Sequence, residues 1–122
     1  MAFVDVHHVQ LACPRGSEAV LRAFYADLLG LTEVAKPAEL VARGGVWFRA
    51  SGVELHLGVE EPFSPARKAH PGLLVDDLDA LAERLESAGH PVERGTLPGL
   101  RRFHTADPYG NRLELLQPDP PD

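Results

Sequence analysis

The chain of 122 residues has little of several features that would mark it as a specialised protein. Its single cysteine, Cys13, permits no internal disulfide bond and favours a reducing compartment. No apolar run is long enough to cross a bilayer. The first ten residues lack the basic and apolar regions of a signal peptide. We therefore expect a cytoplasmic protein that does not act at a membrane.

Basic residues are also scarce. Twelve lysines and arginines stand against eighteen aspartates and glutamates, which gives a formal net charge of −6 at pH 7. This balance argues against nucleic-acid binding as the main role, because neutralising phosphates requires a basic face. With 44% hydrophobic and 25% charged residues, the chain suits a single folded domain over residues 1–122 with a real core.

The sequence does contain a pattern of elements that occurs twice. Hydrophobic periodicity and turn residues predict, in the first half, a strand over 3–12, a helix from Ser17 to about Leu29, and strands over 32–36, 45–50 and 53–59. The second half predicts a strand over 69–75, a helix capped by Asp76 or Asp77 that ends at Gly89, and strands over 91–94, 101–106 and 111–117. Both halves therefore read as strand, helix and three strands.

Alternation along these strands separates apolar from polar side chains. Leu55 and Leu57 share one face, whereas Glu54 and His56 share the other; in the second half Leu113 and Leu115 alternate with Arg112 and Glu114 in the same way. His8 lies on the polar face of the first strand. If Ser51-Gly52 forms a two-residue turn, Trp47 lies opposite His56 and Arg49 lies opposite Glu54.

Four of these polar residues are typical metal ligands. His8 and His56 span the first half with nearly the same separation as His70 and Glu114 in the second. Imidazole and carboxylate groups that share a face suit Zn, Fe, Mn, Co or Ni, and the residue types alone do not choose among these metals. We expect His8, His56, His70 and Glu114 to form a divalent metal site.

Four segments resemble the vicinal oxygen chelate superfamily, which includes glyoxalases, bleomycin-resistance proteins and extradiol dioxygenases. The segments are His8-Val9-Gln10-Leu11-Ala12, Phe24-Tyr25-Ala26-Asp27-Leu28-Leu29-Gly30-Leu31, Ala69-His70-Pro71 and Asp107-Pro108-Tyr109-Gly110-Asn111-Arg112-Leu113-Glu114-Leu115. The resemblance implies an α+β fold of two βαβββ modules, over about 1–60 and 69–117. Their curled mixed sheets would enclose a central cleft and carry the helices on their outer faces.

The resemblance also implies metal ligands from the first and last strands of each module. His8, His70 and Glu114 match three of these places. His56 lies four residues after Gly52, as Glu114 lies four after Gly110, so His56 takes the fourth place, where glyoxalases tend to carry glutamate. It is expected to reach the metal directly or through one water, and Glu54, on the same face, is the other candidate for the fourth place.

Other polar and aromatic residues are expected around this site. Glu54 or His56 would serve as the general base. Trp47, Arg49, Phe103 and Arg112 would contact the substrate. Arg112 would either orient an anionic substrate or steady Glu114, and the sequence leaves open whether His104 lines the cleft or faces solvent.

Two functions fit this reading. The first is a metal-dependent enzyme with lyase, isomerase, transferase or dioxygenase chemistry, whose metal chelates an oxygen-bearing small molecule. The second is a metal-free protein that sequesters a drug, in which the acidic charge and Trp47 would suit a cationic aromatic ligand. A homodimer is expected in either case, because pairing would cover sheet edges.

Overall fold

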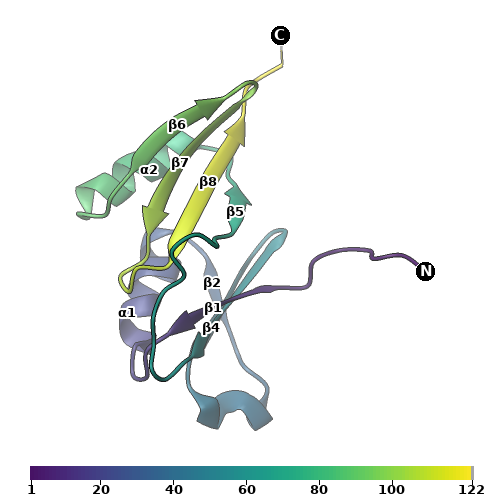
Figure 1. Cartoon of the computed structure of the whole chain (residues 1–122), viewed down its shortest axis with the longest axis vertical. Helices are drawn as coiled ribbons and strands as arrows, with labels where there is room; N and C mark the ends of the chain where they lie inside the picture. Colours follow the sequence, from purple (N-terminus) through teal and green to yellow (C-terminus); the bar gives the residue numbers. More distant parts are fainter. Residues whose placement is uncertain (122) are drawn as a thin grey trace. The chain divides into compact units, whose positions relative to one another are not determined.

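The computed structural model describes residues 1–121, which form two compact units, one from Met1 to Ser64 and one from Pro65 onward. Each unit contains one open, four-stranded mixed sheet and few helices (Figure 1). In each unit the chain runs from a first strand through a helix to three further strands. The prediction of an α+β fold built from two βαβββ modules is therefore confirmed.

The first unit begins with strand β1, Val9–Cys13. Helix α1 follows over Glu18–Arg22 and continues as a π-helical segment, η1, over Ala23–Leu28. The remaining elements are β2 (Thr32–Val34), a 3₁₀ helix η2 (Ala38–Arg43), β3 (Val46–Ala50) and β4 (Val53–Val59). The strand order is β1-β4-β3-β2, with β1 parallel to β4 and the other pairs antiparallel.

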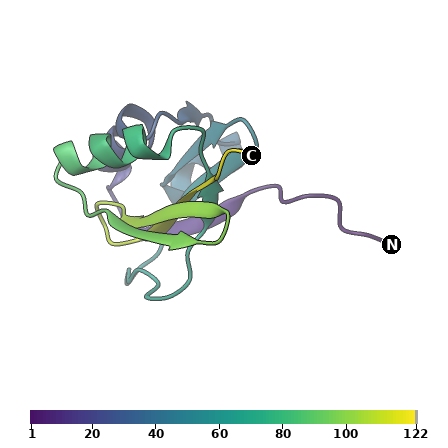
Figure 2. The same ribbon diagram turned by 90° about the horizontal axis from the view of Figure 1, so that it is seen from above.

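The second unit repeats this topology. It contains β5 (Gly72–Leu74), α2 (Leu78–Ser87), β6 (Glu93–Leu97), β7 (Leu100–Ala106) and β8 (Arg112–Pro118). The strand order is β5-β8-β7-β6, and β5 is parallel to β8. Helix α2 lies over one face of this sheet (Figure 2). The polar side chains of the sheet therefore lie on the face that points away from α2.

Each unit buries the apolar face that strand alternation predicts. In the first unit the buried apolar side chains are Cys13, Leu21, Phe24, Tyr25, Val46, Phe48, Leu55 and Leu57. In the second they are Leu78, Ala82, Leu85, Phe103, Leu113 and Leu115. Burying such side chains stabilises a fold by about 1.5–3 kcal/mol each before the cost of lost chain entropy. The helix-facing side of each sheet is therefore committed to the core.

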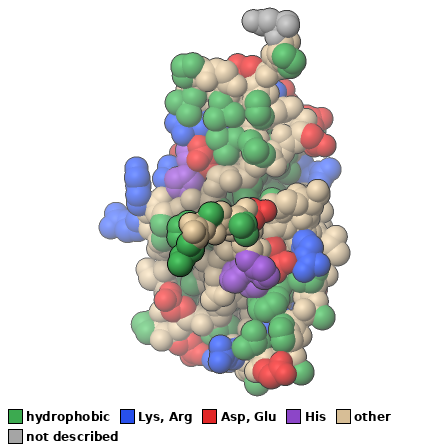
Figure 3. All heavy atoms as spheres, turned by 90° about the vertical axis from the view of Figure 1, so that its right-hand side faces the viewer, with side chains coloured by type: hydrophobic (Ala, Val, Ile, Leu, Met, Phe, Trp, Pro, Cys, Tyr) green, Lys and Arg blue, Asp and Glu red, His purple; other side chains and the backbone are tan. Residues whose placement is uncertain are grey.

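The first strand is shorter than the sequence predicts. A strand was expected over 3–12, but β1 begins at Val9, where pairing with Leu55 of β4 starts. Residues 1–8 form an exposed extended arm (Figure 1), with Phe3 and Val4 almost fully accessible. Figure 3, viewed from the side to which the arm points, shows hydrophobic side chains on the surface. Apolar content makes a segment suited to a strand but does not provide a pairing partner.

The helices also depart from prediction in detail. Ser17 precedes α1, but its hydroxyl donates to the Pro14 carbonyl at 2.6 Å and does not cap the helix. Asp77 does cap α2, with its carboxylate accepting from the Ala80 amide at 3.1 Å. The 3₁₀ helix η2 was not predicted. None of the helices in residues 1–121 has both the length and the apolarity needed to span a membrane.

Candidate functional site

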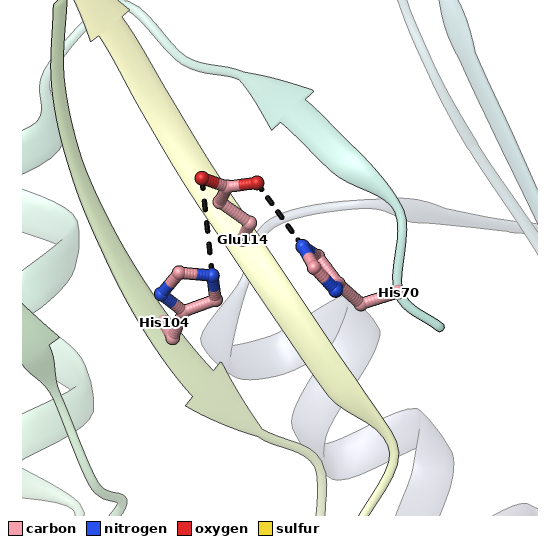
Figure 4. Close-up of side chains that lie close together, drawn as sticks. All are labelled: His70, His104 and Glu114. Atoms are coloured by element: carbon pink, nitrogen blue, oxygen red, sulfur yellow. Dashed lines mark hydrogen bonds and ion pairs between the residues drawn. The ribbon is translucent and has the colours of Figure 1, made fainter. Parts of the chain in front are cut away.

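Three potential metal ligands meet on the polar face of the second sheet, opposite α2 (Figure 4). His70 precedes β5, His104 lies on β7 and Glu114 lies on β8. Within the described part of the chain, this is the one group of three His, Cys, Asp or Glu residues whose ligand atoms all lie within 4.8 Å of one another. We call these residues the His-His-Glu cluster.

Hydrogen bonds fix the orientation of His70. Its Nδ1 lies 2.8 Å from the carbonyl oxygen of Lys68, and its Nε2 lies 3.1 Å from Oε1 of Glu114. A carbonyl oxygen only accepts, so Nδ1 must carry a proton. Nε2 faces a carboxylate oxygen, and this contact is satisfied either by a proton that His70 donates to Glu114 or by a metal cation bound to both atoms. Donation of the second ring N–H to a backbone carbonyl is typical of metal-ligating histidines.

Glu114 is held by a guanidinium as well as by imidazole. Arg102 Nη1 donates to Oε2 at 2.8 Å, which leaves Oε1 directed toward His70. Burial raises the pKa of Glu114, but hydrogen bonds from Arg102 and His70 outweigh this effect and hold that pKa below its usual value. Its side chain is only 12% exposed. Glu114 is therefore an ionised carboxylate in a largely dry position.

His104 was not predicted as a ligand. Its Nε2 lies 3.8 Å from Oε2 of Glu114, and its ring centroid is 5.2 Å from that of His70. Burial lowers the pKa of His104, and the positive charge of Arg112 lowers it further. Both effects favour the neutral imidazole, the form that binds metal ions. The ligand atoms of His70, His104 and Glu114 all lie within 4.8 Å of one another, so the three residues could hold one ion.

The internal repeat contained a signal for His104. In the first unit Trp47 pairs with His56, as the Ser51-Gly52 hairpin predicts. In the second unit His104 pairs with Glu114. The residue on β7 that corresponds to Trp47 is therefore His104, and the same register argument applied to the second hairpin identifies it.

The other two predicted ligands, His8 and His56, lie together in the first unit. The ring of His56 is stacked between Trp47 and His8, at centroid distances of 3.7 and 4.1 Å. His56 is buried, at 3% exposure, whereas His8 is exposed. We call these three residues the aromatic stack. The stack brings His8, which precedes β1, into contact with His56 on β4.

A short hydrogen-bond chain ends at this stack. His56 Nε2 lies 2.7 Å from one oxygen of Glu54, and Arg49 lies 2.8 Å from the other. Burial lowers the pKa of His56 more than its hydrogen bond to Glu54 raises it. Hydrogen bonds from His56 and Arg49 hold the pKa of Glu54 below its usual value. The arrangement is a neutral imidazole that donates to an ionised carboxylate.

Two predicted substrate contacts lie on different faces of the second sheet. Phe103 is 1% exposed and pairs with Leu115, so it belongs to the core side and not to the face of Glu114. The phenylalanine follows the same alternation that places His104 on the polar face. Arg112 does share the face of Glu114, but the guanidinium that steadies Glu114 belongs to Arg102.

A five-residue turn connects the two strands of the cluster. The buried carboxylate of Asp107 accepts from the amides of Tyr109 and Asn111 at 2.9 and 3.0 Å and from the Asn111 side chain at 2.8 Å. Gly110 has a φ of 92°, a conformation that strongly favours glycine. The Asp107-Pro108-Tyr109-Gly110-Asn111 segment therefore acts as a rigid connection that sets the register of His104 against Glu114.

Comparison with known proteins agrees with this architecture. The family model described as the Glyoxalase/Bleomycin resistance protein/Dioxygenase superfamily matches residues 5–115. Comparison with curated proteins gives no match. Among solved structures, a glyoxalase family protein from Bacillus anthracis is 40% identical, with a TM-score of 0.89 over 98% of this chain and 97% of that one.

Two further solved structures are more distant. A glyoxalase/dioxygenase from Nostoc punctiforme is 26% identical, with a TM-score of 0.77 over 95% of this chain and 92% of that one. An antibiotic-binding protein from a Streptomyces species is 24% identical, with a TM-score of 0.73 over 97% of this chain and all of that one (100%), and it shows a shared fold alone. From the family match, supported by the repeated topology, we conclude that the chain belongs to the Glyoxalase/Bleomycin resistance protein/Dioxygenase superfamily.

Proposed function

We propose that the chain is a divalent-metal-dependent enzyme that acts on an oxygen-bearing small molecule. The observation that carries this proposal is the contact between His70 and Glu114. The Lys68 carbonyl orients His70 so that its Nε2 faces a carboxylate oxygen 3.1 Å away, and a metal cation bound to both atoms would satisfy them. His104 supplies a third ligand on the same face.

The donor set suits Zn, Fe, Mn, Co or Ni. When bound, such a metal would stabilise negative charge that develops on a substrate oxygen. Three protein ligands leave positions for that oxygen. Arg102 keeps Glu114 ionised and oriented. Among the lyase, isomerase, transferase and dioxygenase reactions of the superfamily, the residues present do not favour one.

His8 and His56 remain predicted ligands, and Glu54 and His56 remain the predicted proton-transfer pair. The 2.7 Å contact between His56 and an ionised Glu54 supports the second role. Substitution separates the two roles. His8→Ala and His56→Ala should each weaken metal affinity roughly 10- to 100-fold if these residues support the metal. Glu54→Gln should reduce turnover far more than it weakens metal affinity.

Metal binding by the purified apoprotein tests the proposal. Calorimetric titration with each of the five metals should give about one ion per chain, with tight binding for at least one metal. His70→Ala and Glu114→Gln should each reduce that affinity at least tenfold, whereas His90→Ala, outside the cluster, should not. Equal affinity of wild type and a His70→Ala/Glu114→Gln variant for all five metals would refute a metal-dependent function.

A second candidate is metal-free binding of a drug, and the aromatic stack favours it. The ring planes of Trp47 and His56 are parallel within 1°, and the half-buried indole of Trp47 is the surface that a planar cationic ligand would contact. Trp47 is the only tryptophan, so its fluorescence reports on the stack alone. Titration of the apoprotein with bleomycin should change that fluorescence at micromolar concentrations if this function is correct. An unchanged signal would contradict drug binding and leave the metal-dependent function as the one remaining candidate.

We also propose that the chain forms a homodimer. The arm of residues 1–8 exposes Phe3, Val4 and Val6, and β1 and β5 are sheet edges. Light scattering at micromolar concentration should give twice the 13.3 kDa mass of the chain. A monomer under these conditions would contradict this proposal without affecting the metal site.

A further inference from the structure

A groove of about 370 Å³ opens on the second unit. Its walls come from three parts of the unit: the segment that precedes β5, the region of β6, and the ends of β7 and β8 around their connecting turn. The lining residues that matter here are Pro65, Arg67, Glu93, His104, Gly110 and Arg112. All of them belong to the unit that begins at Pro65.

Strand register places this groove beside the His-His-Glu cluster. His104 pairs with Glu114, and two residues further along the hairpin Ala106 pairs with Arg112. A two-residue step along a strand covers about 7 Å and returns to the same face. His104 therefore belongs both to the cluster and to the groove wall, and Arg112 lies one step beyond Glu114 toward the turn.

The arginines of the groove differ from other arginines of the same unit in their partners. Arg94, Arg101 and Arg102 are each engaged by a carboxylate, on Glu86, Asp79 and Glu114 respectively. Arg67 and Arg112 form no ion pair with any residue in the described range 1–121. This is notable in a chain with six more acidic than basic residues. Glu93 is the one carboxylate on the groove, so the two guanidiniums together leave it positive.

The segment before β5, which carries Arg67, packs against the turn that connects β7 and β8. A Cβ placed on Gly110 would lie 3.1 Å from Cγ of Pro65, so the proline packs closely over this glycine. Gly110 also has a φ of 92°, which a larger residue adopts only with strain. The close approach of Pro65 holds the segment before β5 against the end of β8, where Arg112 begins the strand.

From these observations we infer that the groove binds the carboxylate or phosphoryl group of a small organic acid between Arg67 and Arg112. Guanidinium groups recognise both oxyanions through paired N–H donors. The inference deepens the proposed function, because it makes the substrate an acid whose remaining oxygens face the His-His-Glu cluster. Anion binding itself does not require the metal and can be tested without it.

The test uses the metal-free full chain with two probes, inorganic phosphate and malonate, and follows backbone amides by ¹H–¹⁵N NMR. We expect saturable shifts at Ala66, Arg67, Gly110 and Arg112. Arg112→Gln and Arg67→Gln should each weaken binding of the preferred probe at least tenfold, the loss typical of a charged hydrogen bond. Arg112→Lys should weaken it less. Arg22→Gln, whose arginine pairs with Glu33 in the first unit, is the matched control and should bind as wild type does.

The outcomes separate this inference from the metal proposal. Equal binding of both probes by wild type and an Arg67→Gln/Arg112→Gln variant, or shifts confined to other surfaces, would overturn the oxyanion site. Tighter binding of phosphate than malonate would assign a phosphoryl group, and the reverse would assign a carboxylate. A His70→Ala/Glu114→Gln variant should lose the metal but keep the anion. If wild type binds the anion but none of the five metals, only the metal-dependent function would be refuted.

Discussion

Trp47 and His56 stack face to face, with ring centroids 3.7 Å apart and planes inclined by 1°. The pair arises because β3 and β4 place the two residues directly opposite each other. His8 covers the other face of the imidazole at 4.1 Å. A buried, polar ring is thus stabilised on both faces by aromatic contact and at its edge by Glu54.

His56→Ala should therefore destabilise the fold strongly. It removes a 3%-exposed ring, two stacking contacts and a hydrogen bond, and it leaves a cavity beside Trp47. We expect the free energy of unfolding to fall by about 2–4 kcal/mol. His7→Ala, in the exposed arm, should change it by less than about 0.5 kcal/mol. Urea unfolding followed by circular dichroism measures both, and similar losses in the two variants would contradict the structural role of the stack.

The contact between Glu18 and Gly45 should make stability depend on pH. The Gly45 amide donates to Glu18 at 2.7 Å, and this hydrogen bond is the main reason that the pKa of Glu18 lies below its usual value of 4.5. A lowered folded-state pKa means that the stabilisation is complete above the unfolded-state pKa. It is lost as the pH falls through the folded-state value.

Glu18→Gln should remove that dependence. We expect wild type to exceed the variant by about 1 kcal/mol in unfolding free energy at pH 7, and the difference to shrink as the pH falls below about 4.5. Urea titrations between pH 7 and pH 3 give both curves. A difference that grows on acidification would show that the sign is wrong.

Thr105 offers a stabilising substitution. It is 4% exposed, and its hydroxyl oxygen has no hydrogen-bond partner among residues 1–121. It pairs with Leu113, as Phe48 pairs with Leu55 in the first unit. Thr105→Val keeps the shape and removes an unsatisfied polar atom. We expect a gain of up to about 1 kcal/mol in unfolding free energy. Thr32→Val, at an exposed position, should be neutral, and a loss of stability at Thr105 would indicate that the hydroxyl is satisfied.

Arg102 should influence metal affinity without binding the metal. Its hydrogen bond to Oε2 orients Glu114 and keeps it ionised. Loss of such an outer contact typically costs 10- to 100-fold in affinity, so Arg102→Gln should weaken binding of the best metal roughly tenfold. Arg101→Gln is the control, because Arg101 pairs with Asp79 of α2 on the other face. Unchanged or tighter binding by Arg102→Gln would mean that the guanidinium competes with the metal.

Local patterns predicted the elements whose pairing is also local. Strand β4 spans Val53–Val59 as expected, and the Ser51-Gly52 turn sets the register that brings Trp47 opposite His56. The turn residues and the alternation act over a few positions, so they can be read directly from the sequence. The arm of residues 1–8 was misassigned because strand formation depends on a distant partner.

The π-helical turn and the His-His-Glu cluster show two other limits. In η1 the Leu29 amide donates to the Phe24 carbonyl, a wider turn that the spacing of apolar residues does not reveal. His104 could be identified by applying the register argument to the second hairpin, whereas the contact of Arg102 with Glu114 depends on side-chain conformations that strand pairing does not fix. Residue type identified His70 and Glu114 as candidates, but the partners that orient them come from strands and a loop that the sequence alone does not align.

The repeated topology also bears on how such a chain can diverge over generations. His56 and Glu114 occupy the same register position in the two units, as do Trp47 and His104. The same pair of strand positions thus holds an indole opposite an imidazole in the first unit and an imidazole opposite a carboxylate in the second. Buried leucines flank these positions in both units: Leu55 and Leu57 beside His56, and Leu113 and Leu115 beside Glu114. A single codon change on the polar face can therefore alter the chemistry of one unit while the residues of its core stay the same.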